Sequence, residues 1–171
     1  MTNRPYEYYP AWDGKVASPG ILKFVELCKA RWATKCLGTY VHRNMNNNLK
    51  PPQLSVHATG AAADIQYKTE AEARIIWDFL LGKSTIGGVT VDHSALLGIQ
   101  EIHWYAFGVY GAGYRCSRGE GKSGVKIFTA SDNAGSYSGT PTWLHIEISQ
   151  AMAKNPAKLA KAWALIPYPK N

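Results

Sequence analysis

The sequence predicts an α+β protein in which a sheet is flanked by helices, and three segments carry this prediction. Residues 144–149, LHIEIS, alternate apolar and polar side chains, which is the pattern of a strand with one buried face. Residues 18–37 repeat apolar side chains at intervals of three and four, which is the period of a helix with one buried face. Residues 100–110, QEIHWYAFGVY, are rich in aromatic and branched side chains, as strands are.

Helix boundaries are predicted from capping signals. A serine followed by proline opens the first helix at residue 18, and we expect that helix to end near Gly38. Thr69 and Glu72 form a capping box, in which a hydroxyl and a carboxylate three residues later satisfy the first free N–H groups. This box predicts a second helix over residues 70–81.

The remaining segments predict shorter or irregular elements. The stretch after Gly60 predicts a turn that leads into a short strand, and residues 90–97 predict a short helix. Residues 111–142 are dominated by Gly, Ser and Thr, so we expect long surface loops there. Asn155 and Pro156 start a last helix. Its inward face would carry Leu159, Ala162, Trp163 and Ile166.

Length and composition predict one domain. The 171 residues are 46% hydrophobic and 18% charged, and no repeat or change of composition marks a boundary. We therefore expect a single domain over residues 1–171, with residues 1–17 as an irregular aromatic arm across its surface. No run of about 18 apolar residues is present, so we expect no transmembrane segment. The first residues, MTNRPYEYYPAWDG, lack the pattern of a secretory signal, so we expect no signal peptide.

Charge and cysteine content limit the possible partners. The net charge is 19 − 12 = +7, which suits nucleic acid, a membrane surface or an anionic cell-wall polymer. The basic residues are scattered, which is more typical of solubility than of a binding surface, so we expect no specific nucleic-acid partner. Cys28, Cys36 and Cys116 are odd in number and form no CxxC pair. We therefore expect neither a disulfide framework nor a thiolate zinc site.

A histidine and an aspartate seven residues apart form the first candidate site. Five histidines are present, and each taken alone is more often structural than catalytic. His57 stands out because only Gly60 and small residues separate it from Asp64. Such residues let the chain turn sharply and bring both side chains to one point. Imidazole and carboxylate are good zinc ligands, and a catalytic zinc takes three protein groups and a water.

The segment that contains this pair resembles a known signature. Residues 55–65, SVHATGAAADI, are similar to the SxHxxGxAxD signature of the D-alanyl-D-alanine carboxypeptidase family, within the Hedgehog/DD-peptidase group. Residues 143–149, WLHIEIS, resemble the later strand of that family, which supplies its third metal ligand. Residues 97–104, LGIQEIHW, resemble the strand between them in phage and actinobacterial cell-wall lysins. The resemblance spans residues 36–149.

The resemblance implies a fold, a cofactor and a set of site residues. It implies a small antiparallel sheet that carries the zinc ligands and is flanked by helices. His57, Asp64 and His145 match the ligands of the zinc ion (Zn²⁺). Ser55 matches a serine near the substrate, and Arg43 matches an arginine that grips a substrate carboxylate. The alternatives are structural: the histidines could be hydrogen-bonded core residues, Asp64 and Ser55 turn residues, and Arg43 a surface residue.

One position departs from the family pattern. The family places an acidic general base three residues before its last ligand, but here that position is Thr142, whose hydroxyl cannot accept a proton near neutral pH. Strand alternation puts Glu147 on the same side as His145, so Glu147 is one candidate base. Glu101 and Asp132 are others. A further alternative is that the site has lost hydrolysis and keeps only metal and ligand binding.

Two functional hypotheses follow. The resemblance implies a zinc metallopeptidase, of the D,D-carboxypeptidase or L,D-endopeptidase type, that degrades bacterial peptidoglycan as a bacteriophage endolysin. Such a lysin would leave the host cytoplasm for the cell wall or travel in the virion. The alternative is a virion structural or cell-wall-binding protein on a peptidase scaffold, contacting other virion proteins. It is favoured by Thr142, by Trp143 and by the aromatic residues of the first arm, which are Tyr6, Tyr8, Tyr9 and Trp12.

Overall fold

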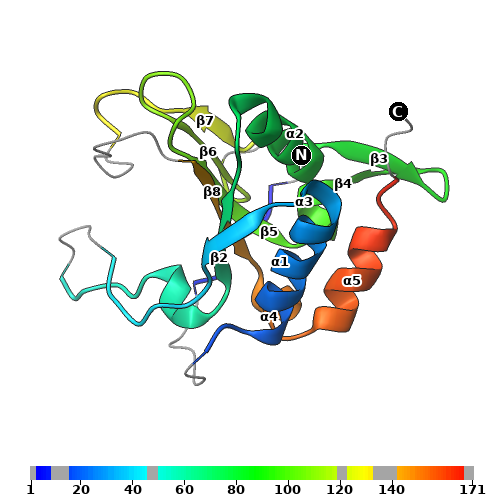
Figure 1. Cartoon of the computed structure of the whole chain (residues 1–171), viewed down its shortest axis with the longest axis horizontal. Coiled ribbons are helices and arrows are strands. Elements are labelled where there is room, and N and C mark those ends of the chain that lie inside the picture. Colours follow the sequence, from blue (N-terminus) through cyan, green and yellow to red (C-terminus); the bar gives the residue numbers. More distant parts are fainter. Residues whose placement is uncertain (1–2, 9–15, 46–49, 119–122, 133–141, 168–171) are drawn as a thin grey trace.

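The computed structural model has an α+β architecture built on a six-stranded antiparallel sheet (Figure 1). It describes residues 3–8, 16–45, 50–118, 123–132 and 142–167. The strands lie in the order β1-β2-β8-β5-β6-β7. Their bounds are Lys35–Gly38 for β1, Ala62–Gln66 for β2, Trp143–Ile148 for β8, Ile99–Trp104 for β5, Ala112–Arg115 for β6 and Val125–Ile127 for β7. The predicted α+β class and the antiparallel sheet are confirmed.

The helices cover one face of this sheet. Figure 1 shows α1, α4 and α5 together on one side of it, and these three helices contact one another. The helices are α1 (Pro19–Trp32), α2 (Glu70–Leu81), α3 (His93–Leu96), α4 (Gln150–Ala153) and α5 (Pro156–Ala164), with a short 3₁₀ helix, η1 (Val56–Thr59). None of the described helices is both long and apolar enough to cross a membrane.

The alternation of β8 gives the sheet a buried face and a polar face. Leu144, Ile146 and Ile148 are fully buried in the core cluster shared with α1 and α5. His145 and Glu147 therefore point to the opposite face, as predicted. The predicted strand after Gly60 is confirmed as β2, and the predicted last helix as α5, with Leu159, Ala162, Trp163 and Ile166 buried. The polar face of the sheet is where the functional side chains lie.

The first helix is shorter than predicted. It ends at Trp32, because Ala33 adopts the left-handed conformation (φ 53°) and its N–H bonds to the carbonyl of Lys29. The next residues form β1, an edge strand that pairs with β2. Cys36 and Leu37 prolonged the apolar pattern of the helix in the sequence, but pairing with β2 overrides that local signal. The second helix, over 70–81, is confirmed with Thr69 as its N-cap.

The predictions for residues 83–132 were partly wrong. Residues 90–92 belong to a hairpin of β3 (Lys83–Ile86) and β4 (Val89–Asp92), and only the end of the predicted short helix exists, as α3. The strand predicted over 100–110 stops at Trp104. The predicted loops of 111–142 contain β6 and β7, while residues 133–141 lie outside the described residues. β6 was not predicted because it contains glycine, which is typical of loops. A Cβ on Gly113 would lie 2.5 Å from the Phe128 ring, so this strand needs glycine for close packing.

The described part of the first arm, residues 3–8, lies beside the start of β5. The N–H of Arg4 donates to the carbonyl of Cys116 (2.8 Å), and its guanidinium donates to the carbonyl of Ile99 (2.6 Å). Gln100 accepts from the N–H of Glu7 and donates to its carbonyl. Tyr9 and Trp12 lie outside the described residues. These contacts hold Tyr6 close to β5 and β8.

The end of α1 provides a test of the shortened helix. Ala33→Gly should raise the free energy of unfolding by about 0.5–1 kcal/mol, because glycine adopts a left-handed conformation without the Cβ penalty. Ala30→Gly, at an exposed position within α1, should lower it by about 0.5–1 kcal/mol, because glycine there has only an entropic cost. Urea unfolding followed by circular dichroism measures both. A helix that continued to Gly38 would instead make both changes destabilising.

Candidate metal centre

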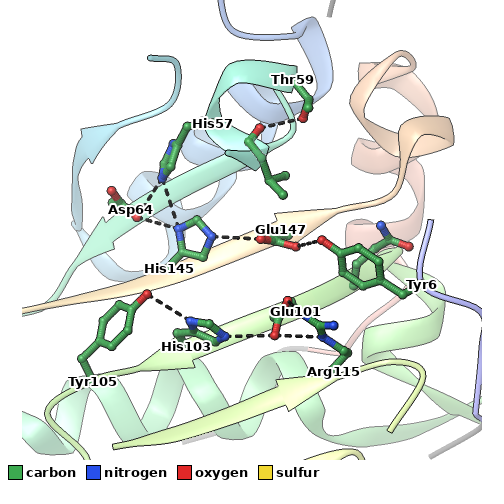
Figure 2. A network of polar contacts seen from close by, with 12 residues as sticks. Tyr6, His57, Thr59, Asp64, Glu101, His103, Tyr105, Arg115, His145 and Glu147 are labelled. Atoms are coloured by element: carbon green, nitrogen blue, oxygen red, sulfur yellow. Dashed lines mark hydrogen bonds and ion pairs between the residues drawn. The ribbon is translucent and has the colours of Figure 1, made fainter. Parts of the chain in front are cut away.

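Three side chains from three elements meet on the polar face of the sheet. His57 comes from η1, Asp64 from β2 and His145 from β8, and Figure 2 shows them pointing toward one another. His145 Nδ1 lies 3.0 Å from Asp64 Oδ1 and 3.2 Å from His57 Nε2. His57 Nε2 lies 3.3 Å from Asp64 Oδ1. The structure thus brings together the three ligands that the resemblance implied.

The local sequence explains why His57 and Asp64 converge. Gly60 has a left-handed conformation (φ 72°) and its N–H bonds to the carbonyl of His57, so the chain turns sharply after η1. β2 then begins at Ala62, and its register pairs Asp64 directly with His145 of β8. The intervening alanines are almost completely buried and leave room for this close turn; they are Ala58, Ala61, Ala62 and Ala63.

The spacing of the donor atoms fits a tetrahedral metal ion. Metal–nitrogen and metal–oxygen bonds of about 2.0–2.1 Å at tetrahedral angles put neighbouring donors about 3.3–3.4 Å apart. The three distances between donor atoms here, 3.0, 3.2 and 3.3 Å, are close to that value. Two imidazoles and one carboxylate are also an established catalytic donor set. His57, Asp64 and His145 could therefore hold a metal ion.

The electrostatics of the three residues favour a positive charge between them. Burial alone would raise the pKa of Asp64, but hydrogen bonds from His145 and His57 hold this pKa well below its usual range. Burial alone would lower the pKa of His145, but hydrogen bonds to Asp64 and Glu147, together with their charges, raise it to about 10. Two carboxylates thus stabilise a cation at His145, and a metal ion can take the place of the proton.

Glu147 lies on the far side of the His145 ring. Its Oε1 lies 3.1 Å from His145 Nε2, the nitrogen that faces away from Asp64. Its Oε2 accepts a hydrogen bond from the hydroxyl of Tyr6 (2.5 Å). Glu147 is only 5% exposed, and both of its oxygens are engaged. An acceptor at Nε2 keeps the proton there and leaves the Nδ1 lone pair for a metal, as carboxylate–histidine pairs commonly do.

A second carboxylate–histidine pair lies on the neighbouring strand, β5. The register pairs His103 with His145 and Glu101 with Glu147. His103 Nε2 lies 2.9 Å from Glu101 Oε1, and His103 Nδ1 lies 3.0 Å from the hydroxyl of Tyr105. Glu101–Ile102–His103 and His145–Ile146–Glu147 are mirror images in the sequence. That mirror pattern on two antiparallel strands is the signal that could have revealed this row of side chains.

Arginine neutralises the second pair but not the first. Arg115 of β6 donates to both oxygens of Glu101, at 3.1 and 2.7 Å. Burial would raise the pKa of Glu101, but the hydrogen bonds from His103 and Arg115 lower it to about 2. Within the described residues, no Lys or Arg forms an ion pair with Asp64 or Glu147. Asp64 and Glu147 are thus paired with imidazoles rather than with Lys or Arg in this part of the chain.

A cavity of about 410 Å³ opens on the same face of the sheet, beside His103. Phe128 forms an apolar wall, while Arg115 and Arg118 face the carboxylates of Glu101 and Asp132 across a lining of mixed charge. The Arg118 guanidinium donates to the carbonyls of Gly113 and Gly124, at 2.7 and 2.9 Å. The cavity is lined by Glu101, His103, Arg115, Ser117, Arg118, Phe128 and Asp132. His103, which lines the cavity, lies next to the candidate ligand His145, with ring centroids 5.9 Å apart.

The other residues singled out in the sequence lie around this centre. Ser55 is buried two residues before His57, and its N–H donates to the carbonyl of Arg43 (3.0 Å). Arg43 is exposed. Burial raises the pKa of Tyr105 well above its usual range, while the charge of Arg43 acts to lower it.

Thr142, which stands where the family pattern has its base, and two further histidines lie outside the candidate ligand group. Thr142 is half-buried next to β8, and its carbonyl accepts from the N–H of Tyr67 (2.8 Å). His93 is a structural residue, because its ring nitrogens contact the carbonyl of Phe79 (2.6 Å) and the hydroxyl of Ser84 (2.7 Å). His42 is exposed.

The fold and the donor atoms define an α+β protein with a candidate metal centre of two histidines and one aspartate. Comparison with protein-family models, with curated proteins and with solved structures finds no match to this chain. Its function is therefore argued from the site and from the motif that resembles the carboxypeptidase signature, because a fold class alone does not define a function.

Metal binding tests the centre directly. The metal-free protein should bind one zinc ion per chain, and free zinc at 100 times its dissociation constant should stabilise the fold by about 2.7 kcal/mol. His57→Ala or His145→Ala should weaken binding by more than about 100-fold, because loss of even an outer partner costs about 10–100-fold. The exposed His42→Ala is the matched control and should bind as the wild type does. Competition with a chromophoric chelator measures the affinity, and equal affinities in all four proteins would contradict the assignment.

The pair of Glu101 and Arg115 should make stability depend on pH. The folded pKa of Glu101, about 2, lies below its ordinary value of 4.5, so the ion pair stabilises the fold above about pH 4.5. That stabilisation is lost as pH falls toward 2. Glu101→Gln should therefore cost on the order of 3 kcal/mol at pH 7. Urea unfolding of the metal-free proteins should show this difference shrinking between pH 4.5 and 3, whereas a difference that is independent of pH would refute the charge pairing.

Proposed function

We propose that this protein is a zinc-dependent peptidase that hydrolyses stem-peptide bonds of bacterial peptidoglycan, as phage lysins do. The observation that carries this proposal is the meeting of His57, Asp64 and His145 with donor atoms 3.0–3.3 Å apart. The substrate class rests on the resemblance of residues 55–65 and 143–149 to the carboxypeptidase motifs. A six-stranded antiparallel sheet with helices on one face is compatible with a Hedgehog/DD-peptidase-like fold.

Zinc suits the donor set better than other common metal ions. Imidazole nitrogen and a single carboxylate oxygen favour zinc, whereas magnesium and calcium require mostly oxygen donors. A bound zinc ion would lower the pKa of its water to about 7 and polarise the scissile carbonyl. Asp64 would balance the charge of the ion. Glu147 would hold the His145 ring in the tautomer whose Nδ1 is free to bind.

The surrounding residues offer contacts for a peptide substrate. Arg43 is exposed, and its carbonyl accepts from the N–H of Ser55, so we expect its side chain to pair with a carboxylate of the stem peptide. Ser55, two residues before His57, is the second proposed substrate contact. The cavity beside His103 would accommodate the part of the stem that extends past the metal. These contacts would orient the scissile bond, which is a large part of catalysis.

Each described candidate base already has a hydrogen-bond or ion-pair partner. Both oxygens of Glu147 are engaged, and they lie on the side of His145 that faces away from Asp64. Glu101 is held by Arg115 and His103, and Asp132 forms an ion pair with Lys126. This geometry favours a positioning role for Glu147. General base catalysis contributes about 10²–10⁴-fold, so we expect slow hydrolysis.

The engaged carboxylates favour a second candidate function. A metal centre whose candidate bases, among the described residues, are all engaged suits a virion structural or cell-wall-binding protein that binds metal and ligand without rapid turnover. The exposed Tyr8 of the first arm, 72% accessible, would be part of a contact surface in that case. In both cases the protein would act at the bacterial cell wall, either after release from the host cytoplasm or as part of the virion.

Cleavage of purified peptidoglycan tests the enzymatic proposal and the role of Glu147 together. Wild-type protein with zinc should release new amine groups, and both a chelator and His57→Ala should abolish this activity. Glu147→Gln should lower activity at limiting zinc, because the ring of His145 loses its negatively charged acceptor. Excess zinc should restore that activity if Glu147 only positions His145.

The remaining outcomes separate the alternatives. A Glu147→Gln protein that binds zinc fully but stays inactive at saturating metal would identify Glu147 as the base. Glu26→Gln is the matched control and should leave activity unchanged, because it changes a carboxylate that is paired with Lys23 on the surface of α1 and does not line the cavity. A zinc-loaded wild type that retains peptidoglycan in a pull-down assay but releases no amine would support the binding function.

A further inference from the structure

Tyr6 connects the first arm to the metal centre. Its hydroxyl donates to Glu147 Oε2 (2.5 Å), and Glu147 Oε1 contacts Nε2 of His145 (3.1 Å). Burial raises the pKa of Tyr6 far above its usual range, and the charge of Glu147 adds to this shift, so the hydroxyl stays protonated and remains a donor. The chain of contacts therefore runs from the arm through one carboxylate to a candidate metal ligand.

The position of Tyr6 is fixed independently of this hydrogen bond. The arm is tied down before it by Arg4, which donates to the carbonyl of Ile99, and after it by the paired contacts of Glu7 with Gln100. The Tyr6 ring also lies over the guanidinium of Arg115, 4.6 Å from the ring centroid. Figure 2 shows Tyr6 beside both Glu147 and Arg115. Tyr6 thus contacts Glu147 of the first carboxylate–histidine pair and Arg115, the partner of Glu101 in the second.

We propose that Tyr6 is a positioning residue of the metal centre and that the first arm thereby sets its metal affinity. This inference rests on the proposed metal-binding function. Glu147 is buried and has no Lys or Arg partner among the described residues, so the Tyr6 hydroxyl is the donor that satisfies its second oxygen. A buried carboxylate oxygen without a donor is costly, and the carboxylate would rotate or recruit water to recover one. Either change loosens its hold on His145.

The tautomer of His145 gives this link its chemical effect. With Glu147 fixed, Nε2 keeps its proton and Nδ1 presents a lone pair toward His57 and Asp64. Outer partners of metal ligands commonly contribute about 10–100-fold to affinity. Tyr6 acts one contact further from the metal than Glu147, so we expect it to contribute less to metal affinity, about 3–10-fold.

The test compares Tyr6, which is part of the arm, with Tyr114, whose hydroxyl contacts Arg4 of the arm. Tyr6→Phe removes the hydroxyl and keeps the ring over Arg115. Tyr114→Phe is the matched control: its buried hydroxyl donates to Ser94 and accepts from Arg4, but it makes no contact with Glu147. Tyr6→Phe should weaken cobalt and zinc binding by about 3–10-fold and shift the visible absorption of the bound cobalt. Tyr114→Phe should lower thermal stability without either effect.

Combination with Glu147→Gln makes the test specific. If Tyr6 acts through Glu147, the double variant should bind metal no more weakly than Glu147→Gln alone, because the effects of linked residues are not additive. An unchanged affinity and cobalt spectrum in Tyr6→Phe, while the wild type binds metal, overturns this inference and leaves the proposed function intact. An equal loss in Tyr114→Phe also overturns it, by assigning the effect to arm docking in general. A wild type that binds no metal overturns both proposals.

Discussion

The register of β8 against its two neighbours aligns most of the polar side chains of the candidate site. β8 pairs Asp64 with His145 on one side and His103 with His145 on the other. The same register aligns Glu147 with Glu101. A shift of β8 by one residue would turn His145 and Glu147 into the core and expose Leu144 and Ile146 instead, so burial of the apolar face enforces the alignment. Burial on one face of the sheet thereby fixes the geometry of the polar site on the other face.

Charge balance explains why this alignment calls for a cation. Asp64, Glu101 and Glu147 lie within two adjacent rows of one sheet face, and buried carboxylates of that kind are costly without partners. Arg115 compensates Glu101. Among the described residues, Asp64 is paired with the imidazoles of His57 and His145, and Glu147 with His145 and the hydroxyl of Tyr6. A divalent ion between His57, Asp64 and His145 would complete the balance that arginine provides one strand away.

Local patterns allowed part of this arrangement to be predicted. The alternation in residues 144–149 sufficed to place His145 and Glu147 on one face, and the capping box at Thr69 located α2, because both signals depend only on neighbouring residues. The end of α1 was mispredicted because Cys36 and Leu37 fit a helical pattern until they pair with β2. β6 was missed because Gly113 is poor in strand propensity and is required by packing against Phe128.

The contacts of the candidate ligands could be predicted less well than the ligands. His57 and Asp64 are close in the chain, so small residues between them signalled their approach. The partners of Glu147 and Glu101 come from residues 6 and 115, and no local pattern links positions so far apart. Only the mirrored order of Glu and His on β5 and β8 hinted that both strands carry polar pairs. Long-range pairing, which sets these contacts, is the part that a single sequence specifies least directly.

The hydrogen bonds of the site support metal binding more than they support catalysis. On the holding side, His145 has its orienting carboxylate, that carboxylate has its own donor, and the arm that carries the donor is anchored on both sides of Tyr6. On the proton-transfer side, Thr142 offers no acceptor. Among the described residues, the candidate bases Glu101, Glu147 and Asp132 are bound by Arg115, Tyr6 and Lys126, respectively. Side chains that are already satisfied resist reorganisation during a reaction. Metal binding is therefore the property to which the described residues contribute most directly, and hydrolysis requires a proton acceptor beyond those contacts.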